Sequence, residues 1–222
     1  MPTKKPTTLE LKATYKLVSL DKINYIKYYL KHRFSAQSLD SIHSPFVFNL
    51  ASKIIKSTEY YYSFMQIEHE RKKLLQNNKS IHLEDFGAGS KVFKSNERKI
   101  SDIAKTSLKP KSQAQLLFKL VNYFNYKNIL ELGTSLGISS AYLAKSSKSI
   151  KLTTIEGSKE VSNLAKQTFD SLKLQNITQI TGEFDNVLPN LLNESSNFDC
   201  IFIDGNHQKE ATIKYFEMFL PH

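Results

Sequence analysis

The stretch that decides the fold is ILELGTSLGISS, residues 129–140. It begins with an apolar, β-prone run, passes through a loop bounded by Gly133 and Gly137, and continues into an apolar, helix-like segment. A cofactor-binding loop of an α/β protein needs this order of buried strand, glycine loop and helix. The stretch therefore predicts the first strand–loop–helix unit of such a domain.

The same rhythm repeats through the rest of the chain. Strands are expected at residues 127–132, 151–156, 176–181 and 198–204. Helices are expected between and after them, at residues 138–147, 158–174, 186–192 and 208–220. Strands that alternate with helices predict a Rossmann-like, doubly wound and mostly parallel sheet, which makes the fold class α/β.

Five of the seven glycines lie just beyond the ends of these predicted strands: Gly133, Gly137, Gly157, Gly182 and Gly205. Ligands of open α/β sheets bind at this carboxyl edge, where glycine lets the backbone approach them closely. Loops also need glycine for ordinary turns. Acidic residues at the same edge favour the ligand interpretation.

Glu131, Glu156 and Asp204 end the first, second and fourth strands, and Glu183 and Asp185 follow the third. An acidic residue at the end of the second strand is placed to accept hydrogen bonds from ribose hydroxyls. The first loop lacks the G-x-G-x-x-G phosphate fingerprint, since Ile138 stands where a third glycine is sought. The predicted ligand has a ribose, no phosphates and a cationic or zwitterionic end, as S-adenosylmethionine has.

ILELGTSLGISSAYLA resembles the first motif of class I S-adenosylmethionine-dependent methyltransferases, and is closest to the catechol-type O-methyltransferases. The segments TIEGS, TGEF and FDCIFIDGNH match the next three motifs of that family in order and spacing, so the resemblance covers about residues 109–222. The family's sheet has seven strands and four are expected here, which predicts a sheet that is incomplete at its C-terminal end.

The resemblance implies a set of cofactor-binding residues. Glu131 and Gly133 would line the methionine end, Ser139 would bind its carboxylate, and Glu156 would hold the ribose. Glu183 and Phe184 would flank the adenine, and Asp204 would lie under the methyl donor. The full expected set is Glu131, Gly133, Thr134, Ser135, Gly137, Ser139, Glu156, Gly157, Glu183, Phe184 and Asp204.

Asp204 and His207 are the expected catalytic residues. In metal-dependent relatives the position of Asp204 is also a ligand of Mg²⁺ or another divalent cation, so a metal site at Asp204 is a further expectation. His207 takes the place of a lysine that acts as general base in catechol-type enzymes, and histidine can do this near neutral pH. A helix cap or a surface hydrogen bond explains His207 equally well.

The first half of the chain is basic and helical. Helices are expected at residues 21–34, 41–57, 59–78, 97–108 and 111–126. The net charge of the chain is +10, and residues 1–110 hold all of this excess, with 20 Lys/Arg against 10 Asp/Glu. Residues 1–108 are interpreted as a cap, lid or dimer surface, and residues 109–222 as the methyltransferase domain. A lysine-rich solvated surface explains the charge more simply than a nucleic-acid site does.

A second glycine stretch, EDFGAGSKV at residues 84–92, lacks a buried strand before it and an apolar helix after it, so it is interpreted as a lid. The sequence shows no apolar run long enough for a membrane span, no signal peptide, and one cysteine, Cys200. These features predict a cytoplasmic protein.

The sequence therefore predicts an S-adenosylmethionine-dependent methyltransferase that transfers a methyl group to the hydroxyl of a small-molecule acceptor. The alternative is a catalytically inactive methyltransferase fold that binds RNA or protein through its basic half. A nicotinamide-dependent oxidoreductase is disfavoured by the glycine pattern of the first loop.

Overall fold

The computed structural model describes residues 23–36, 38–82, 97–194 and 197–221. Two compact units divide the chain, Met1–Lys56 and Ser57–His222. The sequence predicts a boundary between two regions after residue 108, whereas the second compact unit of the structure begins at Ser57. The lid expected at residues 84–92 lies outside the described residues.

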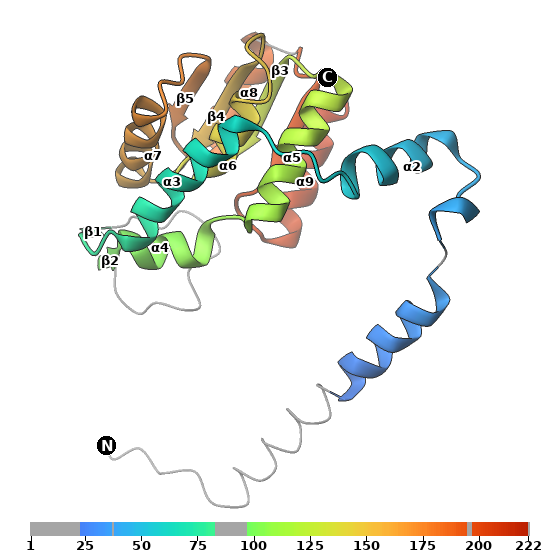
Figure 1. The fold of residues 1–222 in the computed structure, drawn as a ribbon. Coiled ribbons are helices and arrows are strands. Elements are labelled where there is room, and N and C mark those ends of the chain that lie inside the picture. The colour runs from blue at the N-terminus through green and yellow to red at the C-terminus, as the bar shows by residue number, and fades with distance from the viewer. Residues whose placement is uncertain (1–22, 37, 83–96, 195–196, 222) are drawn as a thin grey trace, which may run out of the picture. The chain divides into compact units, whose positions relative to one another are not determined.

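The second unit is built on a four-stranded parallel sheet with the strand order β5-β4-β3-β6 (Figure 1). The strands are β3 (Asn128–Leu132), β4 (Lys151–Glu156), β5 (Ile177–Thr181) and β6 (Cys200–Ile203). β3 lies between β4 and β6 and is almost entirely buried. A continuous apolar run suits such a central parallel strand, because helices cover both of its faces. The α/β class and the parallel, Rossmann-like sheet are confirmed.

Helices pack on both faces of this sheet. Leu130 and Leu132 of β3 face α8 (Phe184–Glu194) and α9 (Lys209–Phe219). Ile129 of the same strand faces the other side, with α5 (Lys111–Phe124) and α6 (Ile138–Ala144). α7 (Lys159–Ser171) also covers that side and begins at Ser158, whose hydroxyl accepts a hydrogen bond from the Val161 amide at 3.4 Å.

A further layer covers α5 and α6. Phe64 and Ile67 of α3 (Tyr62–Gln76) pack on Phe118 and Tyr142. α4 (Ile100–Ser107) packs through Ile103 on residues near the first loop and α7. These contacts hold α3 and α4 against the helices that cover the sheet and against its first loop.

The prediction of a helix over residues 97–108 was wrong for its first three residues. Glu97–Lys99 form strand β2, which pairs antiparallel with β1 (Ser80–His82), and the helix begins only at Ile100. Both strands are mostly exposed and polar, so neither shows the apolar alternation by which a strand is recognised in sequence.

The first unit is helical. It contains a helix over residues 23–35, a 3-10 turn η1 (Leu39–Ser41), α2 (Pro45–Asn49) and a π-helical turn η2 (Leu50–Ile55). As expected, Ser44 caps α2 and Pro45 occupies its first turn. No helix in the described part of the chain is long and apolar enough to cross a membrane.

Candidate active site

The loop after β3 lies against two neighbouring strands. The amide of Gly133 donates to the carbonyl of Ile155 in β4 at 3.0 Å. A Cβ atom added to Gly133 would lie 2.7 Å from the carbonyl oxygen of Asp204, after β6, and the φ of Gly133 is +102°. Only glycine fits this conformation and this contact. The first loop therefore brings the ends of β3, β4 and β6 together.

Glu156 is held at the centre of this edge by backbone amides. Its Oε2 accepts from the Ser135 amide at 2.8 Å and its Oε1 from the Ser158 amide at 3.1 Å. Burial raises the pKa of Glu156, and the hydrogen bonds from these amides and from Gly157 oppose that rise. Each carboxylate oxygen can accept a second hydrogen bond, so Glu156 remains able to bind hydroxyl groups.

Glu131 lies on the α6 side of β3 and is fully buried. Its Oε2 accepts from the hydroxyls of Ser140 and, at 2.8 Å, of Thr154. Its Oε1 has no hydrogen-bond partner among the described residues. Burial raises the pKa of Glu131 to about 7, against the opposing effect of nearby hydroxyls that include Ser139. A buried acceptor without a partner is costly and is suited to a ligand that supplies a donor.

Asp204 follows β6 and pairs with a residue that the sequence did not single out. Its amide continues the sheet by donating to the carbonyl of Leu132 at 2.8 Å. Its Oδ1 lies 2.5 Å from the Nζ of Lys109, which precedes α5. The only sequence signal for Lys109 is its place directly before Pro110, where the backbone is extended. The two residues are 95 positions apart, so their pairing is visible only in the fold.

The other predicted residues lie around this core. Ser139 is buried in the first turn of α6, and Gly137 begins that helix with a φ of +81°. Glu183 and His207 are exposed, and Asn186 donates to the Glu183 carboxylate at 3.4 Å. Thr134 is buried, with its hydroxyl 2.7 Å from that of Thr154.

Phe184 has a packing role that the sequence did not predict. Its ring meets Tyr215 edge-on, with centroids 5.6 Å apart, and a Cβ added to Gly205 would lie 2.6 Å from it. The ring therefore packs against Gly205 in the loop after β6. Its stacking on an adenine stays a prediction.

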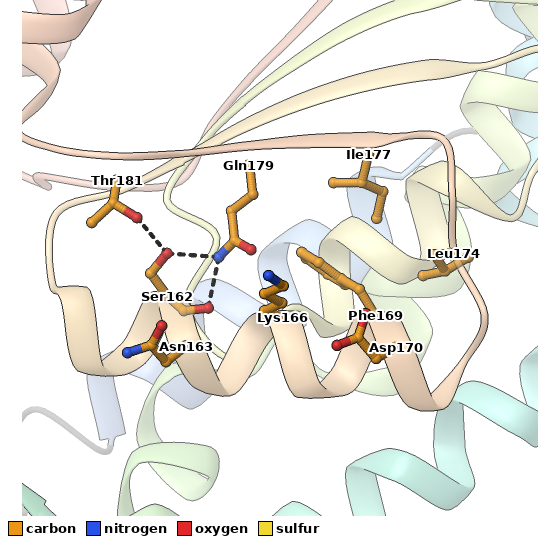
Figure 2. Close-up of a pocket in the computed structure, with 9 residues that line it drawn as sticks. All are labelled: Ser162, Asn163, Lys166, Phe169, Asp170, Leu174, Ile177, Gln179 and Thr181. Atoms are coloured by element: carbon orange, nitrogen blue, oxygen red, sulfur yellow. Dashed lines mark hydrogen bonds between the residues drawn. The ribbon is translucent and has the colours of Figure 1, made fainter.

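A cavity of about 370 Å³ lies elsewhere, between α7 and β5 (Figure 2). Three of its polar side chains are paired with one another: the Ser162 hydroxyl lies 2.7 Å from the hydroxyl of Thr181, and Gln179 donates to Ser162. None of the residues lining it belongs to the expected cofactor set. It is therefore a groove beside the outer strand β5, separate from the candidate site at the carboxyl ends of the strands.

Comparisons with known proteins agree with this picture. Residues 130–222 match the family described as "Methyltransferase domain". A catechol O-methyltransferase of Niastella koreensis is 35% identical over 112 residues, which are 49% of this chain and 50% of that protein. The chain thus spans about half the length of this relative.

Two solved structures share the fold at low identity. An O-methyltransferase from Bacillus cereus in complex with SAH is 21% identical, with a TM-score of 0.52 over 78% of this chain and 64% of its own. The SAH-bound methyltransferase PaMTH1 of Podospora anserina is 15% identical, with a TM-score of 0.54 over 84% and 68%.

Proposed function

We propose that this chain, whose second half belongs to the class I S-adenosylmethionine-dependent methyltransferases, methylates the hydroxyl of a small-molecule acceptor. The observation that carries the proposal is Glu156, fixed by the amides of Ser135 and Ser158 at the sheet edge. A rigid carboxylate beside a glycine loop without a phosphate fingerprint is suited to a ribose that bears no phosphate.

The cofactor set fits S-adenosylmethionine in this structure. The unpartnered Oε1 of Glu131 would accept a hydrogen bond from the ammonium, and Glu156 would accept from the ribose hydroxyls. Gly133, which packs against the backbone of Asp204, would line the methionine end. Ser139 would bind the carboxylate, while Glu183 and Phe184 would border the adenine. The remaining members of the expected set, Thr134, Ser135, Gly137 and Gly157, would shape the two loops.

When bound, S-adenosylmethionine supplies a methyl group on a positively charged sulfur. The chain would orient the acceptor oxygen in line with that methyl group, which accounts for much of the acceleration in such reactions. His207, exposed at the same edge, would take the proton from the acceptor hydroxyl at one of its ring nitrogens. Asp204 would place a negative charge beneath the positively charged donor.

A divalent cation does not fit the described residues. None of them form a group of three or more His, Cys, Asp or Glu side chains that could hold a metal ion. The Oδ1 of Asp204, the expected ligand, is occupied by the Lys109 ammonium. We therefore assign no step to a metal.

Thermal unfolding with added ligands tests the cofactor. S-adenosylmethionine and its demethylated product should raise the melting temperature, whereas NAD should not, because a ligand stabilises only the state that binds it. Glu156→Gln should remove most of that rise, and Glu217→Gln, an exposed change on α9, should keep it. The proposal would be contradicted if NAD raised the melting temperature equally, or if neither S-adenosylmethionine nor S-adenosylhomocysteine raised it.

The second candidate is a binding module for RNA or protein. The helix over residues 23–35 supports it, because this helix exposes Lys27, Lys31 and Arg33 beside Tyr25 and Tyr28. RNA affinity that falls steeply with salt would support this function. A homodimer formed through the first half and a cytoplasmic location are further proposals that rest on the sequence.

A further inference from the structure

Lys109 places a positive charge inside the candidate site. Its Nζ lies 2.5 Å from Asp204 Oδ1, and the two side chains are only 30% and 12% exposed. An ion pair so largely removed from water is stronger than one on the surface. This separates it from pairs such as Lys105–Asp102, whose side chains are 61% and 36% exposed.

The backbone of Lys109 is fixed from another helix. Arg71 of α3, which is 9% exposed, donates from Nη1 to the Lys109 carbonyl at 2.8 Å. Its Nε pairs with Glu68 at 2.9 Å, and Glu68 also accepts from the Tyr142 hydroxyl of α6 at 2.8 Å. Pro110 follows and restricts the conformation of Lys109. The ammonium is thus held at Asp204 by a chain of contacts that runs from α6 through α3.

The ammonium has capacity beyond its contact with Asp204. A lysine ammonium carries three N–H donors, and its ion pair with Asp204 Oδ1 occupies at most one of them. Among the described residues, Asp204 is the only side chain that pairs with Lys109 Nζ. At least two donors therefore remain for an acceptor oxygen bound next to Asp204.

We propose that Lys109 is the resident cation of this site: its ammonium takes, on Asp204, the place of a divalent metal ion and holds the acceptor oxygen. The inference rests on the proposed methyltransferase function. As His207 removes the acceptor proton, the developing negative charge on oxygen faces the Lys109 ammonium. The oxygen then forms its bond to the methyl carbon, and the carbon–sulfur bond breaks with its electrons left on sulfur. Charge balances without a metal.

The affinity for S-adenosylmethionine relative to S-adenosylhomocysteine reports the charge at Asp204, because only the former carries a positive sulfur. Lys109→Met unmasks the carboxylate and should raise the preference for S-adenosylmethionine about tenfold in calorimetric titrations. Lys109→Arg should keep the wild-type ratio, and so should Lys105→Met, the surface control. A ratio in Lys109→Met within twofold of wild type overturns the proposal.

Electron paramagnetic resonance with Mn²⁺ supplies the second arm. The wild-type chain should bind no Mn²⁺ at micromolar concentration. Binding that Asp204→Asn abolishes would show that Asp204 is a metal ligand and would overturn the proposal.

If the wild-type chain binds neither S-adenosylmethionine nor S-adenosylhomocysteine, the proposed function fails. The ion pair between Lys109 and Asp204 is then tested without a ligand. A double-mutant cycle of Lys109→Met and Asp204→Asn in urea should give a coupling of about fivefold in the unfolding equilibrium constant. Independent effects of the two changes would overturn the proposal.

Discussion

The buried carboxyl group of Glu131 makes the stability of the fold depend on pH. Its pKa is about 7 in the folded chain against an ordinary value of 4.5, because burial disfavours the charged form. The folded state therefore binds this proton more tightly than the unfolded state does. The resulting stabilisation is complete below pH 4.5 and is lost as the pH rises through 7. The difference in pKa corresponds to about 3 kcal/mol.

Glu131→Gln removes this titration and keeps the shape of the side chain. The amide oxygen can still accept from Ser140 and Thr154, as Oε2 of Glu131 does. We expect the variant to match the wild type near pH 4.5 and to exceed its free energy of unfolding by about 3 kcal/mol at pH 8.

Urea unfolding followed by circular dichroism at pH 4.5, 6 and 8 measures this difference. The control is Glu217→Gln, because Glu217 is exposed and its loss should leave the pH profile of the wild type unchanged. If Glu131→Gln and wild type ran parallel across the three pH values, the burial argument for Glu131 would be refuted.

Three other changes test the site. Gly133→Ala should lower the free energy of unfolding by about 3 kcal/mol, since a Cβ would strike the backbone of Asp204 at a positive φ, and Gly157→Ala, at a glycine without a positive φ, should lower it by less than about 1 kcal/mol. Glu156→Gln should weaken S-adenosylmethionine binding about tenfold in calorimetry while Glu160→Gln leaves it unchanged, and an equal loss in both would contradict the ribose assignment. Arg71→Met should destabilise the fold by about 2 kcal/mol, because it leaves Glu68 without its cation. Lys73→Met removes a lysine whose side chain is 56% exposed, and should have an effect below about 1 kcal/mol in urea unfolding.

The parallel sheet could be predicted from the sequence because its signals are local. Each of the four strands is a short β-prone run with a glycine just after it, and the structure begins and ends each within two residues of the expected bounds. Strand β2 could not be predicted in the same way. Glu97–Lys99 are polar and become a strand only by pairing with Ser80–His82, so their own sequence does not indicate the pairing.

The site was predictable in the parts that follow strands. Glu131, Gly133, Glu156 and Asp204 meet at one edge because parallel strands all end there. Lys109 was not predictable, because its backbone is held by Arg71 of α3, a helix that packs on α5 and α6 and is distant from Asp204 in the sequence. Assignments of these residues to individual parts of the cofactor stay predictions.

The contact between Gly133 and the backbone of Asp204 also has a consequence for synthesis of the chain. Gly133 of the first loop is synthesised about 70 residues before Asp204, against which it packs in the folded chain. At 5–20 residues per second this interval lasts roughly 4 to 14 s. During that time β3 lacks the neighbour β6, and the unpaired backbone N–H and C=O groups of its edge are open to other chains. A nascent-chain chaperone should therefore engage this protein in that interval, between translation of residue 133 and of residue 204.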